Sequence, residues 1–329
     1  MPDFPRKNDF LTFEINNLQK SIHSRNETAN KMAPNTPPPQ KSKGAAKAKG
    51  KIQDDGLASR YKKMTQIEHI LKLPDTYIGS TEMSEPQEYW VWNGEENKME
   101  RRAVAIVPGL FKIFDEILVN AYDQWVRCRE MKAKHQVKEI AVSLGEDSMI
   151  TVRNDGEGID VEIHPEHGIW VPELIFGHLL TSGNYEQKGK VTGGKNGLGA
   201  KCGAVYSSIF RIETVDHKRK RKYTQEFRDN LGVRDTPIIE ENYTGKPYTQ
   251  IQFLPDYKRF GGLESLDEAH RALFTRRVID LTACTDKTVA VSLNGKVLPI
   301  KTLERYVDLY VGEKSEHPRV YERVDDRWE

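Results

Sequence analysis

The segment from residue 110 to residue 130 most restricts what this chain can fold into, because it predicts one long helix with two distinct faces. Its apolar stripe consists of Leu110, Phe114, Ile117, Leu118, Ala121 and Trp125. That stripe is wide enough to bury the helix against a sheet. A second, polar stripe consists of Glu116, Asn120, Asp123 and Arg127. Their spacings of four, three and four residues place these side chains on one helical face.

Two interpretations of the polar stripe are open at this point. In the structural one, the helix is partly exposed and carries Glu–Asn and Asp–Arg pairs, each worth a few tenths of a kcal/mol, which is the commoner origin of such spacing. In the chemical one, the amide oxygen of Asn120 suits Mg²⁺, a hard cation that keeps several waters. Glu116, one turn earlier, would then orient or deprotonate a water aimed at a γ-phosphate. The chemical interpretation requires a base-binding residue and a phosphate-binding loop downstream.

Candidates for both occur downstream. The text "RNDGEGID" places Asn154 or Asp155 at the end of an apolar strand, where the side chain could accept a hydrogen bond from an exocyclic amine. The glycines that follow, Gly156 and Gly158, would let a ring lie on the backbone. The text "TSGN" at 181–184 adds hydroxyls and an amide where a predicted helix stops.

The glycine-rich segment "KGKVTGGKNGLGAK" at 188–201 almost matches two nucleotide-binding loops and completes neither. It fits G-x-x-x-x-G-K, but Asn196 stands where that loop needs Ser or Thr. It also begins G-x-G-x-x-G, but the third glycine, Gly203, comes one residue late. The segment nevertheless supplies backbone N–H groups and the charges of Lys195 and Lys201. A helix beginning at Gly199 would add the positive end of its dipole.

The remaining text predicts an organisation into a tail and two domains. Residues 1–57 are Pro-rich and basic and are expected to be a disordered tail. A first domain is expected at 58–262, and residues 263–329 are expected to begin a second domain that is not completed. Further predicted helices span 59–73, 171–180 and 266–284, predicted strands span 88–92, 101–107, 138–144, 148–154, 208–215, 222–228 and 248–254, and a hairpin with an Asn-Gly turn spans 288–301.

Composition excludes several classes of protein. The net charge of +1 argues against a chain that binds nucleic acid over its whole surface, although local basic patches remain possible. Three cysteines without C-x-x-C spacing indicate reduced intracellular thiols. The sequence shows no signal peptide and no apolar run of membrane-spanning length. Two basic runs keep two interpretations each: 41–51 is a solvated linker or a nuclear-targeting or DNA-touching arm, and 217–222 is a solvated hairpin tip or a DNA contact.

Four segments in order, "FDEILVNAYDQ", "NDGEGI", "LIFGHLLTSGNY" and "VTGGKNGLGAK", together resemble the ATPase region of eukaryotic-type (type IIA) DNA topoisomerases. That family belongs to the GHKL superfamily, whose ATP site is the Bergerat fold. The resemblance runs from about residue 60 to residue 329 and includes "TQIEHILKLPDTYIGS" and "VSLNGKVLPIK". It implies an α+β fold, a two-layer α/β sandwich in which helices cover one face of a mixed sheet. A partial transducer domain of ribosomal-protein-like fold would follow at 263–329.

The resemblance also implies roles for individual residues. Glu116 would be the general base, and Asn120 the Mg²⁺ ligand. Tyr61 would lie in a strap that reaches the partner subunit when ATP closes a homodimer. The remaining residues expected to contact the nucleotide are Arg127, Asn154, Gly158, Thr181, Ser182, Asn184, Gly194, Lys195, Asn196, Gly197, Leu198, Gly199, Lys201 and Thr249. Within this set, Asn154 and Thr249 would lie near adenine, and residues 194–199 with Lys201 would close over the triphosphate.

The chain departs from the family's usual text at several positions, which suggests a divergent branch, viral or protist. Gly183 stands where a second serine is common, and Leu198 where tyrosine is usual. Gln124 replaces a usual asparagine, and Glu157 replaces a usual lysine, which changes the local charge by two units. These departures leave Glu116 untouched, as well as the expected Mg²⁺ ligand.

As a whole, the resemblance implies the ATP-driven N-gate of an enzyme that captures and passes double-stranded DNA, relaxing supercoils and decatenating DNA, in the nucleus of a eukaryote or in the cytoplasm or nucleus of a virus's host. The γ-phosphate-sensing lysine, the toprim cluster and the DNA-cleaving tyrosine would lie beyond this sequence. We therefore expect the chain to bind ATP with Mg²⁺, to hydrolyse it slowly and to cut no DNA. The alternatives are another GHKL machine, such as a mismatch-repair ATPase, a chaperone or a histidine kinase, and a degenerate fragment that binds without turnover.

Overall fold

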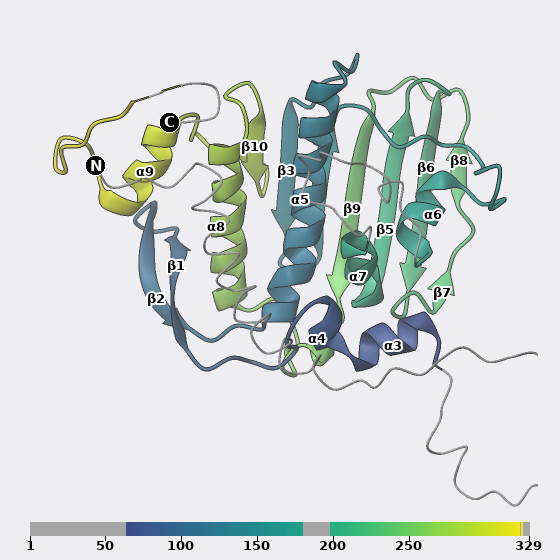
Figure 1. Ribbon diagram of the computed structural model, residues 1–329, viewed down its shortest axis with the longest axis horizontal. Helices are drawn as coiled ribbons and strands as arrows, with labels where there is room; N and C mark the ends of the chain where they lie inside the picture. The colour runs from purple at the N-terminus through teal and green to yellow at the C-terminus, as the bar shows by residue number, and fades with distance from the viewer. Residues whose placement is uncertain (1–63, 180–197, 323, 325–329) are drawn as a thin grey trace, which may run out of the picture. The chain divides into compact units, whose positions relative to one another are not determined.

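A computed structural model describes residues 64–179, 198–322 and 324 of the chain, and residues Gln66–Tyr321 form one unit. Within that unit a nine-stranded sheet has the order β11-β10-β3-β4-β9-β5-β6-β7, with β8 paired to β6 (Figure 1). Its strands are β3 (Glu139–Leu144), β4 (Ile150–Asp155), β5 (Ser207–Asp216), β6 (Arg221–Arg228), β7 (Val233–Arg234), β8 (Ile238–Glu240), β9 (Tyr248–Pro255), β10 (Ala290–Leu293) and β11 (Lys296–Val297).

The sheet is mixed because β10 pairs in parallel with β3, whereas the other pairings between its described strands are antiparallel. Side chains alternate between its faces, as the period of two requires. In the middle of the sheet, Thr249 of β9 is opposite Asn154 of β4 on one side and Thr214 of β5 on the other. This register places three polar side chains in one row on one face of the sheet.

Four helices cover that face: α5 (Pro108–Glu130), α6 (Val171–Gly177), α7 (Gly199–Val205) and α8 (Glu268–Cys284) (Figure 1). The apolar stripe predicted for α5 is buried, with Leu110 and Phe114 fully inaccessible to solvent. It contributes to one continuous core cluster together with Ile140, Phe210 and Phe253 of the sheet. The long central helix therefore forms for the predicted reason, burial of one face against a sheet.

Shorter elements complete the unit at its edges. They are α3 (Gln66–Lys72), α4 (Pro74–Tyr77), the hairpin strands β1 (Gln87–Asn93) and β2 (Lys98–Val104), the 3₁₀ turn η1 (Tyr257–Arg259) and α9 (Leu303–Val311). The hairpin packs on α8 and α9, where Val91 joins Leu273 in one small cluster and Met99 joins Ile279 in another. Among the residues that the structure describes, none of the helices has the length and apolar character needed to cross a membrane.

The predicted elements are largely confirmed, with differences at their ends. The first helix ends before Pro74, as predicted, but Pro74 itself then opens the short helix α4, because proline is well suited to a first helical turn. Helix α6 ends at Gly177, earlier than predicted. Strands β7 and β8 were not predicted. Helix α8 and strand β10, which lie beyond the predicted boundary at 262, pack in the same two layers, and that boundary stays a prediction.

Candidate functional site

The polar stripe of α5 is partly exposed along its length, but its members differ in environment. The side chains of Asn120 and Arg127 are exposed, Glu116 is half-buried, and Asp123 is buried. Glu116 forms an ion pair with Lys112, one turn earlier on the helix. The structural interpretation of the stripe paired Glu116 with Asn120, and the ion pair with Lys112 is an additional contact.

The end of the glycine-rich segment lies directly against Glu116. A side-chain carbon built at Gly199 would lie 1.7 Å from Oε2 of Glu116, far inside any permitted contact. Gly199 is also the first residue of α7, so the condition set in the sequence analysis, a helix that begins at Gly199, is met. The α5 carboxylate and the start of α7 therefore meet so closely that a side chain at position 199 would displace the Glu116 carboxylate.

Lys201, in the first turn of α7, is 1% exposed. Burial lowers the pKa of its ammonium group to about 8, because a charge is poorly solvated away from water. An anion brought close to this group would offset that penalty. The neighbouring Cys202 is buried too, and the pKa of its thiol is raised to about 12, chiefly by burial and further by Glu116. The three cysteines of the chain are free thiols, as predicted.

At the end of β4, the structure distinguishes the two residues that the sequence left open. Oδ1 of Asp155 accepts hydrogen bonds from the backbone N–H groups of Lys138 (2.7 Å) and Glu139 (2.8 Å), which fastens it to the start of β3. Asn154 points to the opposite face, is 6% exposed and donates from Nδ2 to the carbonyl of Asp155 (2.8 Å). Asn154 is therefore the one that shares a face of the sheet with Thr249.

Thr214, which the sequence interpretation missed, organises this row of side chains. Its Oγ1 accepts a hydrogen bond from the backbone N–H of Ile159 (3.0 Å), donates to the carbonyl of Tyr248 (3.0 Å) and lies 3.1 Å from Oγ1 of Thr249. It is fully buried. The available signal was a polar residue at a core-facing position of the predicted strand 208–215, where burial normally demands hydrogen-bond partners.

The glycines after β4 allow this loop to approach the sheet closely. A side-chain carbon at Gly158 would lie 1.9 Å from the carbonyl oxygen of Val215. Gly156 has a φ of +99°, a backbone region that other residues rarely adopt. The described backbone therefore requires glycine at both positions, 156 and 158.

Gln124 and Glu157, the two departures from the family pattern that carry polar side chains, contact each other. Nε2 of Gln124 donates to the carbonyl of Glu157 (2.6 Å), and the guanidinium of Arg127 donates to Oε1 of Gln124 (2.7 Å). The carboxylate of Glu157 lies 3.3 Å from Nδ1 of His217 and 3.8 Å from Nζ of Lys218. The loop after β4 is thereby tied to α5 on one side and to the β5–β6 hairpin on the other.

The basic run at 217–222 forms the tip of that hairpin, and most of its charges are paired. Arg221 pairs with Glu241, and Lys222 with Glu213. Arg219 contacts the carboxylates of Asp160, Glu162 and Asp216. These pairs favour the interpretation of a solvated tip over that of a surface that binds DNA.

Several predicted site residues lie outside the described residues: Tyr61, Thr181, Ser182, Asn184, Gly194, Lys195, Asn196 and Gly197. Leu198, the residue before α7, is described and packs partly buried against the core. Among the described residues, no three His, Cys, Asp or Glu side chains are grouped so as to hold a metal ion.

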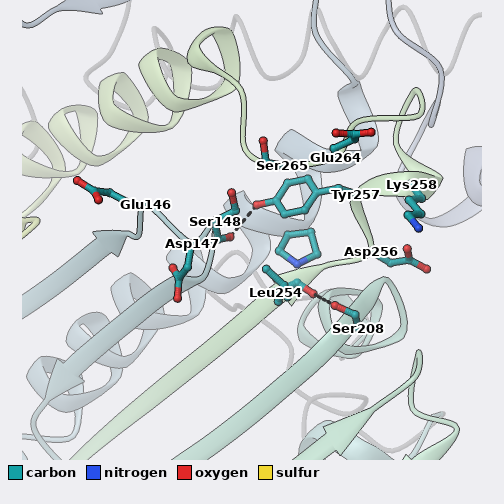
Figure 2. Close-up of a pocket in the computed structure, with 11 residues that line it drawn as sticks. Glu146, Asp147, Ser148, Ser208, Leu254, Asp256, Tyr257, Lys258, Glu264 and Ser265 are labelled. Atoms are coloured by element: carbon teal, nitrogen blue, oxygen red, sulfur yellow. Dashed lines mark hydrogen bonds between the residues drawn. The ribbon is translucent and has the colours of Figure 1, made fainter.

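A hollow of about 510 Å³ lies at the opposite end of the sheet (Figure 2). It is lined by the β3–β4 turn at Asp147 and Ser148, by the end of β9 at Leu254, and by Tyr257 and Glu264. Asn154 is six residues from Ser148 along an extended strand, so the two ends are about 20 Å apart. None of the predicted site residues that the structure describes lines this hollow.

Comparison with known proteins identifies what the chain resembles. No family model matches it. The "DNA topoisomerase 2" of Arabidopsis thaliana is 44% identical over 294 residues, which is 87% of this chain and 19% of that protein. The chain thus spans about a fifth of the length of the curated relatives it matches.

Solved structures give the same picture. The ATPase region of Saccharomyces cerevisiae topoisomerase II superposes with a TM-score of 0.75 at 44% identity, covering 82% of this chain and 70% of that one. The 43K ATPase domain of Thermus thermophilus gyrase B superposes with a TM-score of 0.51 at 21% identity, covering 75% and 53%. The two-layer α+β fold of the GHKL type, predicted from the sequence, is confirmed by these matches and by the mixed sheet.

Proposed function

Because the chain belongs to the family of type II DNA topoisomerase ATPase regions, we propose that it binds ATP and hydrolyses it. The contact between Gly199 and Glu116 carries this proposal. It brings the end of a glycine-rich segment, where phosphates are usually held, against a carboxylate on a rigid helix. A carboxylate at that place can orient and deprotonate the water that attacks a γ-phosphate.

Asn120 fits the role of Mg²⁺ ligand by its chemistry and position. Its exposed amide lies one turn after Glu116 on the same face of α5, and Mg²⁺ prefers oxygen ligands and keeps several waters. When bound, the ion would neutralise charge on the triphosphate. The exposed guanidinium of Arg127, anchored by Gln124, would reach the phosphates from the same helix.

The row of polar side chains formed by Asn154, Thr249 and Thr214 on the sheet supports a site for the base of the nucleotide. Asn154 and Thr249 would face adenine, and Gly158 would allow the ring to lie on the loop after β4. Lys201 would place its charge beside the phosphates, since an anion there offsets the cost of its burial. The roles proposed for Thr181, Ser182, Asn184, Gly194, Lys195, Asn196, Gly197 and Leu198, contacts to ribose and phosphate and closure over the triphosphate, follow from the family alone.

At the level of the whole protein, we propose the N-gate of a type IIA DNA topoisomerase that acts in a nucleus. ATP would close a homodimer, with the segment around Tyr61 reaching the partner subunit, and the closed dimer would capture double-stranded DNA for strand passage. Residues 58–262 would be the ATPase domain, and residues 263–329 would begin the transducer. The support is the family membership and the similarity to DNA topoisomerase 2 proteins.

The proposal is tested with the 329-residue chain by calorimetry of ATP binding and by phosphate release over long incubations. We expect Glu116→Ala to bind ATP within about threefold of wild type and to release phosphate at least about 100-fold more slowly. Asn120→Ala should lose the Mg²⁺-dependent part of the affinity. Glu264→Ala, at the far end of the sheet, is the matched control and should change neither quantity.

Two results would count against the proposal. Absence of ATP binding by the wild-type chain would remove it altogether. Binding without any release of phosphate, unchanged by Glu116→Ala, would support the alternative of a binding fragment without turnover.

A further inference from the structure

Helix α8 lies alongside α5 and contacts it through three side chains, His270, Phe274 and Arg277 (Figure 1). Their spacings of four and three residues place them on one face of α8. Phe274 is fully buried and stacks on Phe114 of α5, with ring centroids 4.1 Å apart and an interplanar angle of 9°. The middle of this interface is therefore an apolar contact that holds the two helices together.

His270 holds the beginning of α5. It is fully buried, and its Nε2 accepts a hydrogen bond from the backbone N–H of Val107 (2.8 Å), the residue that precedes the helix. Its Nδ1 lies 2.7 Å from Oδ1 of Asp267, so the N–H on Nδ1 donates to that carboxylate. Val107 has no side-chain cap, and α8 supplies the partner that the start of α5 needs.

Arg277 forms the third contact, an ion pair with Asp115 in which Nε and Oδ1 are 2.7 Å apart. The two side chains are only 11% and 12% exposed. Burial alone would lower the pKa of Arg277, but the carboxylates of Asp115 and Asp280 outweigh it, and the net pKa is raised. The pair is thus well formed in a site from which water is largely excluded.

Asp115 immediately precedes Glu116 on α5. Successive side chains on an α-helix are turned by about 100°, so a helix that directs Asp115 toward α8 directs Glu116 to a different side. On that side, Glu116 meets Gly199 of α7. Arg277 thus holds α5 at Asp115, and Gly199 meets the same helix at the next residue, Glu116.

We propose that Arg277 is a positioning residue for Glu116, because its ion pair with Asp115 fixes the rotation of α5 and so the place of the Glu116 carboxylate. The proposal rests on the proposed function of Glu116 as general base. A displacement of about 1 Å at a reacting group can cost about 100-fold in rate. A buried ion pair, by contrast, often adds little to stability compared with apolar side chains of similar volume. The apolar Phe114–Phe274 stack holds the helices together, and the ion pair sets their orientation.

The experiment uses the full chain with Arg277→Gln, Asp115→Asn, the double variant and the conservative Arg277→Lys. The matched control is Tyr306→Phe, which removes a 2.7 Å hydrogen bond to Asp280 from α9 without touching α5. Four quantities are measured for each variant: kcat and KM for ATP, the thermal midpoint, and the amide hydrogen exchange of residues 112–120.

We expect Arg277→Gln to lower kcat by about 10- to 100-fold with KM changed less than about threefold. Asp115→Asn should behave alike, and the double variant should be no slower than the slower single one, because both changes break one contact. Arg277→Lys should recover most of the loss, since it keeps a charge beside Asp115. Exchange at residues 112–120 should quicken in Arg277→Gln and not in Tyr306→Phe, although both variants lose thermal stability.

The results that would overturn the inference are distinct from failure of the proposed function. If Glu116→Ala abolishes turnover and Arg277→Gln leaves kcat within twofold, the positioning role is wrong and the general base stands. If Glu116→Ala leaves turnover intact, the proposed function itself is wrong, and with it the inference. If the chain turns over too slowly to measure, unchanged exchange at residues 112–120 in Arg277→Gln overturns the positioning role.

Discussion

The two ends of the central sheet both contain buried polar groups but use them differently. At the far end, the hydroxyl of Tyr257 donates to the carbonyl of Ser148 (2.9 Å) (Figure 2). Oγ of Ser148 accepts from the backbone N–H of Leu266 (3.0 Å). These bonds fasten one loop to another. At the opposite end, called the motif end because the text "NDGEGI" lies there, Oγ1 of Thr214 accepts from the backbone N–H of Ile159 and so holds the loop after β4 close to the strands. Glycine at 158 permits this approach, because a side-chain carbon there would lie 1.9 Å from the carbonyl oxygen of Val215.

The proposed site and the hollow lie at opposite ends of the sheet. The far end has the hollow of Figure 2, rimmed by carboxylates such as Glu146 and Glu264. The motif end has two close approaches of glycine, Gly158 to the backbone of β5 and Gly199 to the Glu116 carboxylate, and a buried lysine, Lys201. We propose that these pre-arranged groups carry the chemistry, and the following variants test that proposal.

The largest effect is expected from Gly199→Ala. The new methyl group would overlap Oε2 of Glu116, so the carboxylate or the start of α7 must move. We expect ATP turnover to fall about 100-fold, because the general base is displaced. The rate of phosphate release at saturating ATP measures this turnover.

The control for this variant lies at the other end of the sheet. A side-chain carbon at Gly145 would lie 2.2 Å from Oδ1 of Asp147 and 3.1 Å from the carbonyl oxygen of Met149, so this turn must also adjust, but it lies about 20 Å from the proposed site. Gly145→Ala should therefore keep turnover within about twofold. Equal losses in the two variants would contradict the proposed difference between the ends.

A smaller effect is expected from Thr214→Val, which keeps the shape of the side chain and removes its hydroxyl. The N–H of Ile159 would lose its buried acceptor, at a cost of about 1–3 kcal/mol. Because that N–H belongs to the loop proposed to lie under the nucleotide, we expect ATP affinity to fall by about tenfold. Calorimetry of ATP binding measures this change in affinity.

Ser148→Ala is the counterpart at the far end, since it removes the acceptor for the N–H of Leu266. It should lower the thermal midpoint about as much as Thr214→Val does, and it should leave the affinity for ATP unchanged. An unchanged affinity in Thr214→Val would show that Thr214 serves stability alone.

The smallest effect is a pH dependence that belongs to Lys201. Its pKa in the free protein is lowered to about 8 by burial, so its charge is present below that pH and is lost as pH rises. Binding of a triphosphate would favour the charged form, and affinity should therefore fall by about threefold to tenfold between pH 7 and pH 9. Calorimetry across that range should show the decline in the wild-type chain and a flat profile in Lys201→Met. A decline of equal size in both proteins would assign it to another group.

The sequence was sufficient where a signal was local. The apolar spacing of α5, from Leu110 to Trp125, predicted its existence and its buried face. The Asn294-Gly295 dipeptide predicted the β10–β11 turn, and both residues have the positive φ that such a turn requires (+48° and +76°).

The sequence alone was insufficient where the residues that contact each other lie far apart along the chain. Nothing near Asp115 in the sequence reveals Arg277, because the pair depends on how two helices cross. Thr214 is the one threonine of its predicted strand, and its three contacts come from loops and strands more than 30 residues away. Strands β7 and β8, of two and three residues, are too short to show any periodicity.

The parallel pairing of β10 with β3 has a consequence for the order in which the chain can mature. β3 is made early, but the strand that covers its edge, Ala290–Leu293, is synthesised about 150 residues later. Until then the nascent sheet has a bare edge of apolar and β-branched residues, the kind of edge that pairs with other chains. We therefore expect products of premature termination before residue 290 to aggregate, and a host that makes this protein to depend on chaperones during that interval.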